Sequence, residues 1–136
     1  MHSTNYYDTL IEVAEDCKAG GGVTPVEKSG KKTVACLEYE IISDHPYRYT
    51  SDDVIFQVYA LRNNIAPTEM KAEKQRYFSK GRPCFRASPL PKSYGWGIHS
   101  DKVGKIALVA IGSPRYDELC RDTSVAKKKA MRSKKV

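Results

Sequence analysis

The sequence predicts an α+β fold in which helices pack on a small antiparallel sheet that includes a C-terminal β-hairpin. Helical and strand patterns are segregated along the chain rather than alternating, which favours this class. The length of 136 residues fits one domain. Hydrophobic residues make up 40% and charged residues 29%, which allows a packed core. We therefore expect one compact domain over residues 1–122 and a basic, flexible tail over residues 123–136.

The N-terminal half predicts a strand, a loop and two helices. An apolar run predicts a strand over residues 8–13. The glycine-rich residues 19–30 predict a mobile connection, and they lack the Gly-Lys-Ser/Thr of a phosphate-binding loop. Apolar residues at helical spacing predict a helix over residues 33–43. Thr50 and Asp53 then resemble a capping box, and the apolar helix that they begin is expected to be the central buried one.

The C-terminal half predicts a third helix, a hairpin and a last helix. Pro67 fits the first position of a helix that ends near Gly81. Three prolines within residues 82–92 allow an extended segment but not a central strand. Two apolar arms predict a hairpin over residues 95–112. Ser113 and the proline after it begin the last helix.

Positive charge is concentrated in the C-terminal half. The formal net charge is +7, with a net of −4 over residues 1–64 and +11 over residues 65–136. The last fourteen residues hold six basic groups and no acid, so removing them leaves +1. These groups are Lys127, Lys128, Lys129, Arg132, Lys134 and Lys135. The basic balance is therefore mostly a property of the tail and weak support for a basic folded surface.

The cysteines and the hydropathy pattern indicate a cytoplasmic protein. The four cysteines are Cys17, Cys36, Cys84 and Cys120. Their wide spacing fits neither a zinc framework nor a disulfide scaffold, so we expect free thiols in a reducing compartment. The sequence has no secretory signal and no apolar run of membrane-spanning length. We expect no membrane partner, no cofactor and no metal.

The segment from residue 74 to residue 100 is the best candidate for function. It has no acid, six basic residues and interleaved aromatics, a composition typical of phosphate and ring binding. We expect an anionic small molecule or nucleotide-like ligand in a cleft formed by Arg86, Ser88, Lys92, Tyr94, Trp96 and His99. Strand alternation places Gly95 and Gly97 on the face of His99, as a shallow floor for a ligand. The same alternation pairs Trp96 with Ile98 and favours a core position for the indole.

Two other functions remain open. One is nucleic-acid binding through the Lys74–Lys92 face and the six basic groups of the tail. The other is an enzyme in which His99 works with a carboxylate, either Asp101 or one of the acids at positions 52 and 53. Cys84, His99 and Asp101 also contain the residue types of a thiol nucleophile, a base and an orienting acid. No signature accompanies them, so a binding protein is favoured over an enzyme. The sequence makes no prediction of oligomeric state.

Several blocks of the sequence are similar to one known family. They are Thr4–Tyr6, Tyr49–Val54, Phe78–Gly81, Tyr94–Gly97 with His99, and Lys129–Arg132. Through these blocks the chain resembles the domain of unknown function 6157, a family of small, mostly bacterial proteins. The resemblance implies a stand-alone domain and implies no activity. It also predicts that Met131 and Arg132 pack back onto the body while the surrounding lysines stay solvated.

Overall fold

The computed structural model describes residues 2–133, which include one four-stranded sheet of order β3-β2-β1-β4. The strands are β1 (Thr9–Glu12), β2 (Trp96–Ser100), β3 (Ile106–Ala110) and β4 (Ala126–Lys129). Strand β2 pairs antiparallel with both β1 and β3, which confirms the hairpin, whereas β4 pairs parallel with β1. The α+β class is confirmed, but the sheet is mixed rather than antiparallel because the chain returns beside β1 in the same direction.

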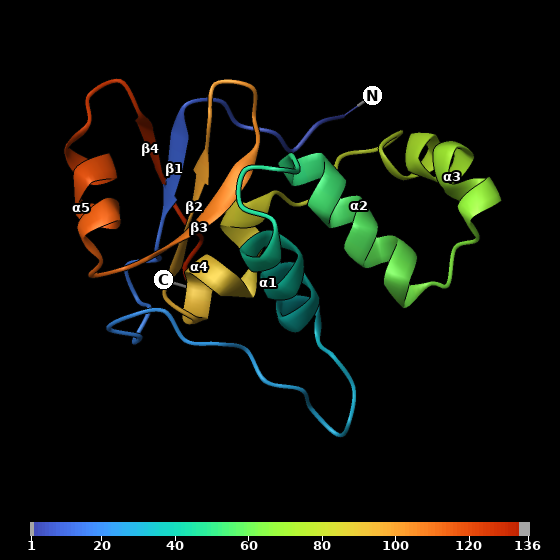
Figure 1. Cartoon of the computed structure of the whole chain (residues 1–136), viewed down its shortest axis with the longest axis horizontal. Coiled ribbons are helices and arrows are strands. Elements are labelled where there is room, and N and C mark those ends of the chain that lie inside the picture. The colour runs from blue at the N-terminus through green and yellow to red at the C-terminus, as the bar shows by residue number, and fades with distance from the viewer. Residues whose placement is uncertain (1, 134–136) are drawn as a thin grey trace.

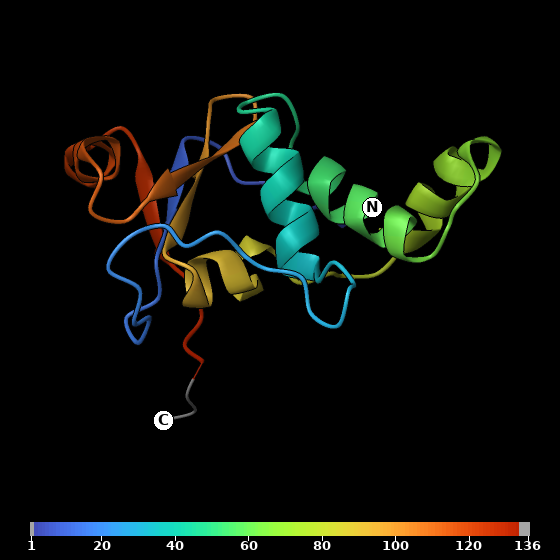
Figure 2. The ribbon, with the colours of Figure 1, turned by 60° about the horizontal axis from the view of Figure 1, so that its bottom comes forward.

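Helices cover both faces of the sheet (Figures 1 and 2). They are α1 (Val34–Asp44), α2 (Ser51–Arg62), α3 (Met70–Tyr77), α4 (Pro89–Ser93) and α5 (Pro114–Arg121). Helix α5 lies on one face, and α1 and α4 lie on the other, with α2 and α3 farther out. Alternation along the strands supplies both cores, since Ile11 and Ile98 pack toward α1 and α4 while Leu10 and Val109 pack toward α5.

Helix α2 is not the central buried helix that its composition predicts. It packs between α1 and α3, and its Leu61 is 59% exposed. Its apolar residues divide between two cores, because Val54 joins the cluster around α1 while Phe56 and Ala60 form a separate cluster with Phe78. The helices that pack on the sheet are α1 and α5, which contact β3, and α4, which contacts β2.

Side-chain caps set most helix starts, and the capping box that the sequence predicts on α2 is present. Thr33 caps α1, Ser113 caps α5, and Thr50 with Asp53 forms a full capping box on α2. The third helix begins with a 3₁₀ turn, η1 (Pro67–Glu69), and ends at Tyr77, before the predicted stop at Gly81.

The proline-rich segment 82–92 is helical over most of its length rather than extended. It forms a second 3₁₀ turn, η2 (Phe85–Ala87), followed directly by α4. The Ser88 hydroxyl accepts a 3.2 Å hydrogen bond from Leu90 N, and Pro89 occupies the first helical position. A capped proline at this position favours a helix start over a strand.

The residues expected to form a flexible tail instead belong to the fold as far as residue 133. Ala126 N donates to the carbonyl of Asp8, and Ala130 N donates to that of Glu12. Val125 and Ala130 are buried on either side of the lysine run. A boundary between domain and tail after residue 122 therefore does not fit the structure. Two buried apolar side chains and pairing with the free edge of β1 hold this segment in place. Met131 and Arg132 contact the body as predicted, since Met131 N donates to the carbonyl of Arg86 and Arg132 pairs with Glu15. The Met131 side chain is nevertheless 53% exposed.

Candidate functional site

The six residues predicted to share one cleft lie in separate parts of the molecule. Arg86 and Ser88 belong to the η2–α4 segment, Lys92 opens on a different cavity, and His99 lies on the opposite face of the sheet from Trp96.

Trp96 and Tyr94 fix the glycine-rich loop. The indole Nε1 donates a 2.9 Å hydrogen bond to the carbonyl of Val23, and Val23 N donates a 2.8 Å bond to the carbonyl of Tyr94. The indole packs with Tyr39 at a centroid distance of 5.5 Å, and a Cβ at Gly22 would lie 2.5 Å from the indole ring. The loop is therefore held at Val23, and Trp96 contributes to the core and to this anchor.

The glycine floor predicted beside His99 is covered by the chain itself. A Cβ at Gly97 would lie 2.8 Å from the ring of Tyr116, and one at Gly95 would lie 2.2 Å from the carbonyl oxygen of Gly21. Both glycines permit close approach, Gly97 within β2 and Gly95 just before it, where its φ is +76°. The groups that approach are Tyr116 from α5 and the loop backbone.

His99 is 8% exposed and has a structural partner. Its Nδ1 lies 2.7 Å from the hydroxyl of Tyr47. Burial, and then the guanidinium of Arg115, lowers the pKa of His99. Asp101 serves the hairpin turn, because its Oδ1 accepts hydrogen bonds from Val103 N and Lys105 N.

Asp52 and Asp53, the other acids predicted as partners of His99, form hydrogen bonds with other residues. Asp52 accepts hydrogen bonds from Ser3 and Thr4 in the N-terminal segment. Asp53 is bonded to Thr50 and to Lys74, and although burial alone would raise its pKa, these bonds lower it. Over residues 2–133, no group of three or more His, Cys, Asp or Glu side chains could hold a metal ion.

Most basic groups of the predicted nucleic-acid face have partners within the fold. Arg86 Nε donates a 2.6 Å hydrogen bond to the carbonyl of Lys129, and the Arg82 guanidinium lies 3.9 Å from the centroid of the Tyr77 ring. Further pairs are Lys74 with Asp53, Arg76 with Glu73, Lys129 with Glu12, and Arg132 with Glu15. Lys127 donates to the carbonyls of Asp122 and Val125. Lys134 and Lys135 lie outside the described residues.

The structure shows an ionisable site that the sequence reasoning missed, at Glu38. A cavity of about 200 Å³ lies between α1 and the η2–α4 segment, and Glu38 is only 6% exposed beside it. The lining residues are Val34, Glu38, Ile55, Tyr77, Pro83, Cys84, Phe85, Ala87, Ser88 and Pro89. The signal was present, since Glu38 sits four residues from both Val34 and Ile42 and so interrupts an apolar face of α1.

Ser88 holds the Glu38 carboxyl. The serine hydroxyl donates a 2.7 Å hydrogen bond to Oε1 of Glu38. Burial raises the pKa of Glu38 to about 7, and the bond from Ser88 opposes this rise. The side chain can therefore gain or lose a proton close to neutral pH, which suits an acid–base or binding role.

Cys84 lines the same cavity and contacts Tyr6 rather than His99. Its Sγ lies 3.3 Å from the Tyr6 hydroxyl. Burial and then Cys84 raise the pKa of Tyr6, while Arg86 opposes the rise. Cys84 packs on the α1 side of the sheet and His99 on the α5 side, so the predicted Cys84–His99–Asp101 set is not assembled.

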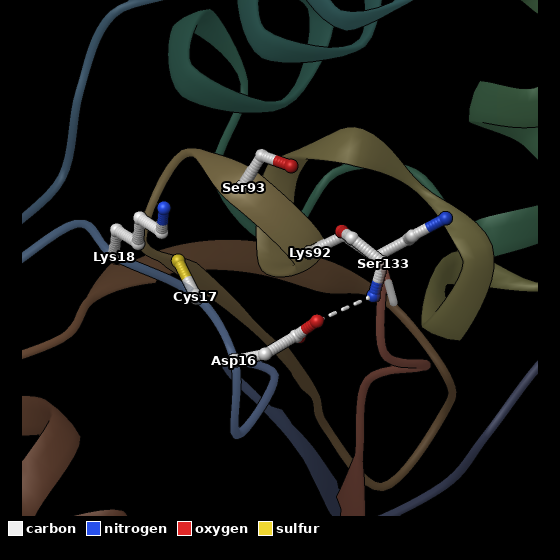
Figure 3. A pocket seen from close by; sticks show the side chains of 6 residues that line it. All are labelled: Asp16, Cys17, Lys18, Lys92, Ser93 and Ser133. Atoms are coloured by element: carbon white, nitrogen blue, oxygen red, sulfur yellow. Dashed lines mark hydrogen bonds between the residues drawn. The ribbon is translucent and has the colours of Figure 1, made fainter. Parts of the chain in front are cut away.

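A second cavity, of about 370 Å³, lies where the chain leaves β1 and meets α4 (Figure 3). It is lined by Asp16, Cys17, Lys18, Lys92, Ser93 and Ser133. Ser133 N donates a 2.9 Å hydrogen bond to Oδ2 of Asp16. Lys92 thus lines a different cavity from Ser88, and Lys18, from the segment after β1, lines it too.

Comparison with known proteins identifies a family for this chain, and that family has no assigned activity. The searches of curated proteins and of solved structures gave no match. Over residues 2–133, no helix is long and apolar enough to span a bilayer. The family model described as "Family of unknown function (DUF6157)" matches residues 1–136, the whole chain, and the protein therefore belongs to that family.

Proposed function

We propose that this protein binds a small molecule in the Glu38 cavity, with the Glu38 carboxyl as the anchoring group. The observation that carries the proposal is a 6% exposed carboxyl beside a cavity, held by a hydrogen bond from Ser88. Burying a carboxyl disfavours its charged form and is destabilising unless the charge is compensated. A ligand that donates a hydrogen bond or carries a positive charge would supply that compensation.

The lining of the cavity limits the class of ligand. Apart from Glu38, Ser88 and Cys84, it consists of apolar and aromatic side chains and prolines. Its volume of about 200 Å³ is below that of most drug-sized sites, which run to roughly 300–1,000 Å³. We infer a compact, largely apolar molecule with one amino group. An ionised Glu38 would repel an anion, so this cavity does not suit the anionic ligand predicted from the sequence.

A matched set of small aromatic probes tests this proposal. Amide chemical shifts would be followed during titration with benzylamine, benzyl alcohol and benzoate at pH 8, where Glu38 is mostly ionised. Benzylamine should shift the amides of α1 and of residues 84–89 and should bind most tightly, and benzoate should bind least.

Two variants separate a site effect from a change in overall charge. Glu38→Gln should abolish the preference for benzylamine. Glu40→Gln removes a carboxyl that pairs with Lys32 at the surface, and it should leave the preference unchanged. Equal binding of benzylamine and benzoate, or the same response in both variants, would overturn the proposal.

One observation favours an anion site as a second candidate. Lys18, Lys92 and Ser93 line the cavity of about 370 Å³, and ammonium groups with a hydroxyl suit a phosphate or carboxylate. Titration with inorganic phosphate should shift the amides near residues 18 and 92, and Lys92→Gln should weaken the effect. We further propose a cytoplasmic location, which the four unpaired thiols support.

A further inference from the structure

We propose that the outer edge of β4 binds an extended, acidic segment of a partner protein as a fifth strand that runs parallel to β4. Strand β4 ends the sheet order and pairs with β1 on its inner side (Figure 1). Three of its four residues are exposed. Addition of a strand to a sheet edge is a recurring mode of peptide recognition. This inference is independent of the proposed function, because no residue of β4 lines the Glu38 cavity.

The pairing with β1 determines which backbone groups of β4 face outward. Ala126 N donates to the carbonyl of Asp8, and Ala130 N donates to that of Glu12. Backbone groups of successive strand residues point to opposite sides, so residues 126, 128 and 130 face β1. The N–H and C=O groups of Lys127 and Lys129 therefore point away from the sheet. Such outward groups can pair with another chain.

Arg86 occupies the end of this edge in the way that one residue of a parallel strand would. Its Nε donates a 2.6 Å hydrogen bond to the carbonyl of Lys129, and its own carbonyl accepts a 2.8 Å bond from Met131 N. In a parallel ladder, one residue likewise bonds to two residues that are two positions apart on its neighbour. Arg86 thus leaves three outward groups for a ligand, which are Lys127 N–H, Lys127 C=O and Lys129 N–H.

A parallel chain satisfies all three of these groups. One residue of the added chain donates to Lys127 C=O and accepts from Lys129 N–H. The residue two positions before it accepts from Lys127 N–H. The added chain ends or turns away where it meets Arg86, so the ladder that we propose has three hydrogen bonds.

The side chains of β4 favour an acidic partner. Lys128 pairs with Ile11 and so lies on the face of the sheet that carries α1 and α4. Within residues 2–133, the Lys128 ammonium forms no ion pair or hydrogen bond. Residues of the added chain whose backbone groups face β4 have their side chains on this same face, so an acid at alternate positions meets Lys128. A second copy of β4 is disfavoured, because lysines would oppose lysines.

A hexapeptide of alternating threonine and glutamate, blocked at both ends, is a suitable probe. The full chain would be titrated with it at low salt, and amide exchange along β4 would be followed by NMR. The amides of Lys127 and Lys129 should exchange several-fold more slowly in the complex, because they gain acceptors. The Lys128 amide already faces β1 and should change little.

Two methylated peptides separate strand addition from simple attraction between charges. N-methylation of the glutamates removes the donors that face β4 and should weaken binding about tenfold, as expected for the loss of a backbone hydrogen bond with its acceptor left unpaired. N-methylation of the threonines removes donors that face away from β4 and should leave the affinity nearly unchanged. Both peptides carry the same charge.

Two lysine variants test the charge complementarity. Lys128→Gln should weaken binding of the unmodified peptide about two- to fivefold, the range of an exposed ion pair. Lys102→Gln makes the same change in charge at the turn between β2 and β3, and it should have no effect. Thermal unfolding of each variant would show that the fold is retained.

Three outcomes would overturn the proposal. The first is equal weakening by both methylated peptides. The second is equal slowing of exchange at Lys127, Lys128 and Lys129. The third is binding of a thymidine hexanucleotide as tightly as the peptide, because the nucleotide carries negative charge but cannot reproduce a backbone ladder; this result would favour a nucleic-acid surface instead.

Discussion

Ser88 and Glu38 lie 50 residues apart in the chain, and the serine hydroxyl donates a 2.7 Å hydrogen bond to Oε1 of the buried carboxyl. The same hydroxyl accepts a 3.2 Å bond from Leu90 N at the start of α4. One oxygen therefore caps α4 and also links that helix to α1. This link places an ionisable group beside a cavity at the junction of two helices.

Replacement of Glu38 by glutamine should change how stability depends on pH. The ordinary pKa of 4.5 rises to about 7 in the folded protein. The folded chain thus keeps a proton that the unfolded chain releases as the pH rises from about 4.5 to about 7. The free energy of unfolding should fall over this window, and by pH 8 the loss should be on the order of 2–4 kcal/mol. Urea unfolding at pH 5 and pH 8 would measure it.

Glu38→Gln should flatten this part of the pH profile, because glutamine has no proton to release. Glu40→Gln should keep the wild-type profile, since the Glu40 carboxylate pairs with Lys32 at the surface. Parallel profiles for the wild type and Glu38→Gln would show that the buried carboxyl does not titrate in the expected range.

Replacement of Ser88 by alanine should destabilise the fold more than the loss of a helix cap alone. A capping serine contributes about 1 kcal/mol, and an unpaired buried polar group costs about 1–3 kcal/mol more. Ser113→Ala is the matched control, because the Ser113 hydroxyl also caps a helix, accepting a 3.2 Å bond from Tyr116 N. Chemical denaturation should show a larger loss for Ser88→Ala, and equal losses would contradict the role given to the Ser88–Glu38 bond.

Local signals predicted much of the fold, because each depends on neighbouring residues. Thr50 caps α2 and Ser113 begins α5 as their positions indicate, and alternation places Ile98 in the core. Strand β4 could not be predicted in this way. Three consecutive lysines are typical of a solvated segment, and lysines also protect edge strands from further pairing. Its position depends on the free edge of β1, which is more than 110 residues away in the sequence.

The candidate site was harder to predict because its members come together only through tertiary contacts. The basic and aromatic residues of segment 74–100 are close in sequence, yet the fold sends Trp96 to one face of the sheet and His99 to the other. Cys84 instead meets Tyr6, which is 78 residues away. Composition identified the segment that contains Cys84 and Ser88. It did not identify Glu38 of α1, which lines the same cavity.

An alanine at Gly97 should destabilise the sheet. A Cβ there would lie 2.8 Å from Cε2 of Tyr116 and 3.2 Å from the carbonyl oxygen of Ile11. The Tyr116 ring has little freedom to move, because its hydroxyl accepts a 2.9 Å bond from Val13 N. Overpacking of this kind costs about 1–3 kcal/mol. Gly81→Ala meets no atom within 4 Å and should leave the melting temperature almost unchanged; a similar loss in both variants would rule out the steric explanation.

The C-terminal segment should be protected from amide exchange, and Arg86 should contribute to that protection. Met131 N donates a 2.8 Å bond to the carbonyl of Arg86, while Arg86 Nε donates a 2.6 Å bond to the carbonyl of Lys129. Arg86→Ala keeps the first bond and removes the second, so the end of β4 should open more often. A hydrogen bond from a charged group contributes about 1.5–3 kcal/mol, so exchange at Met131 should rise about tenfold or more. Arg82→Ala, which alters a guanidinium stacked on Tyr77, should not change it. Exchange at Met131 in the wild type as fast as in an unfolded peptide would contradict the docked position of this segment.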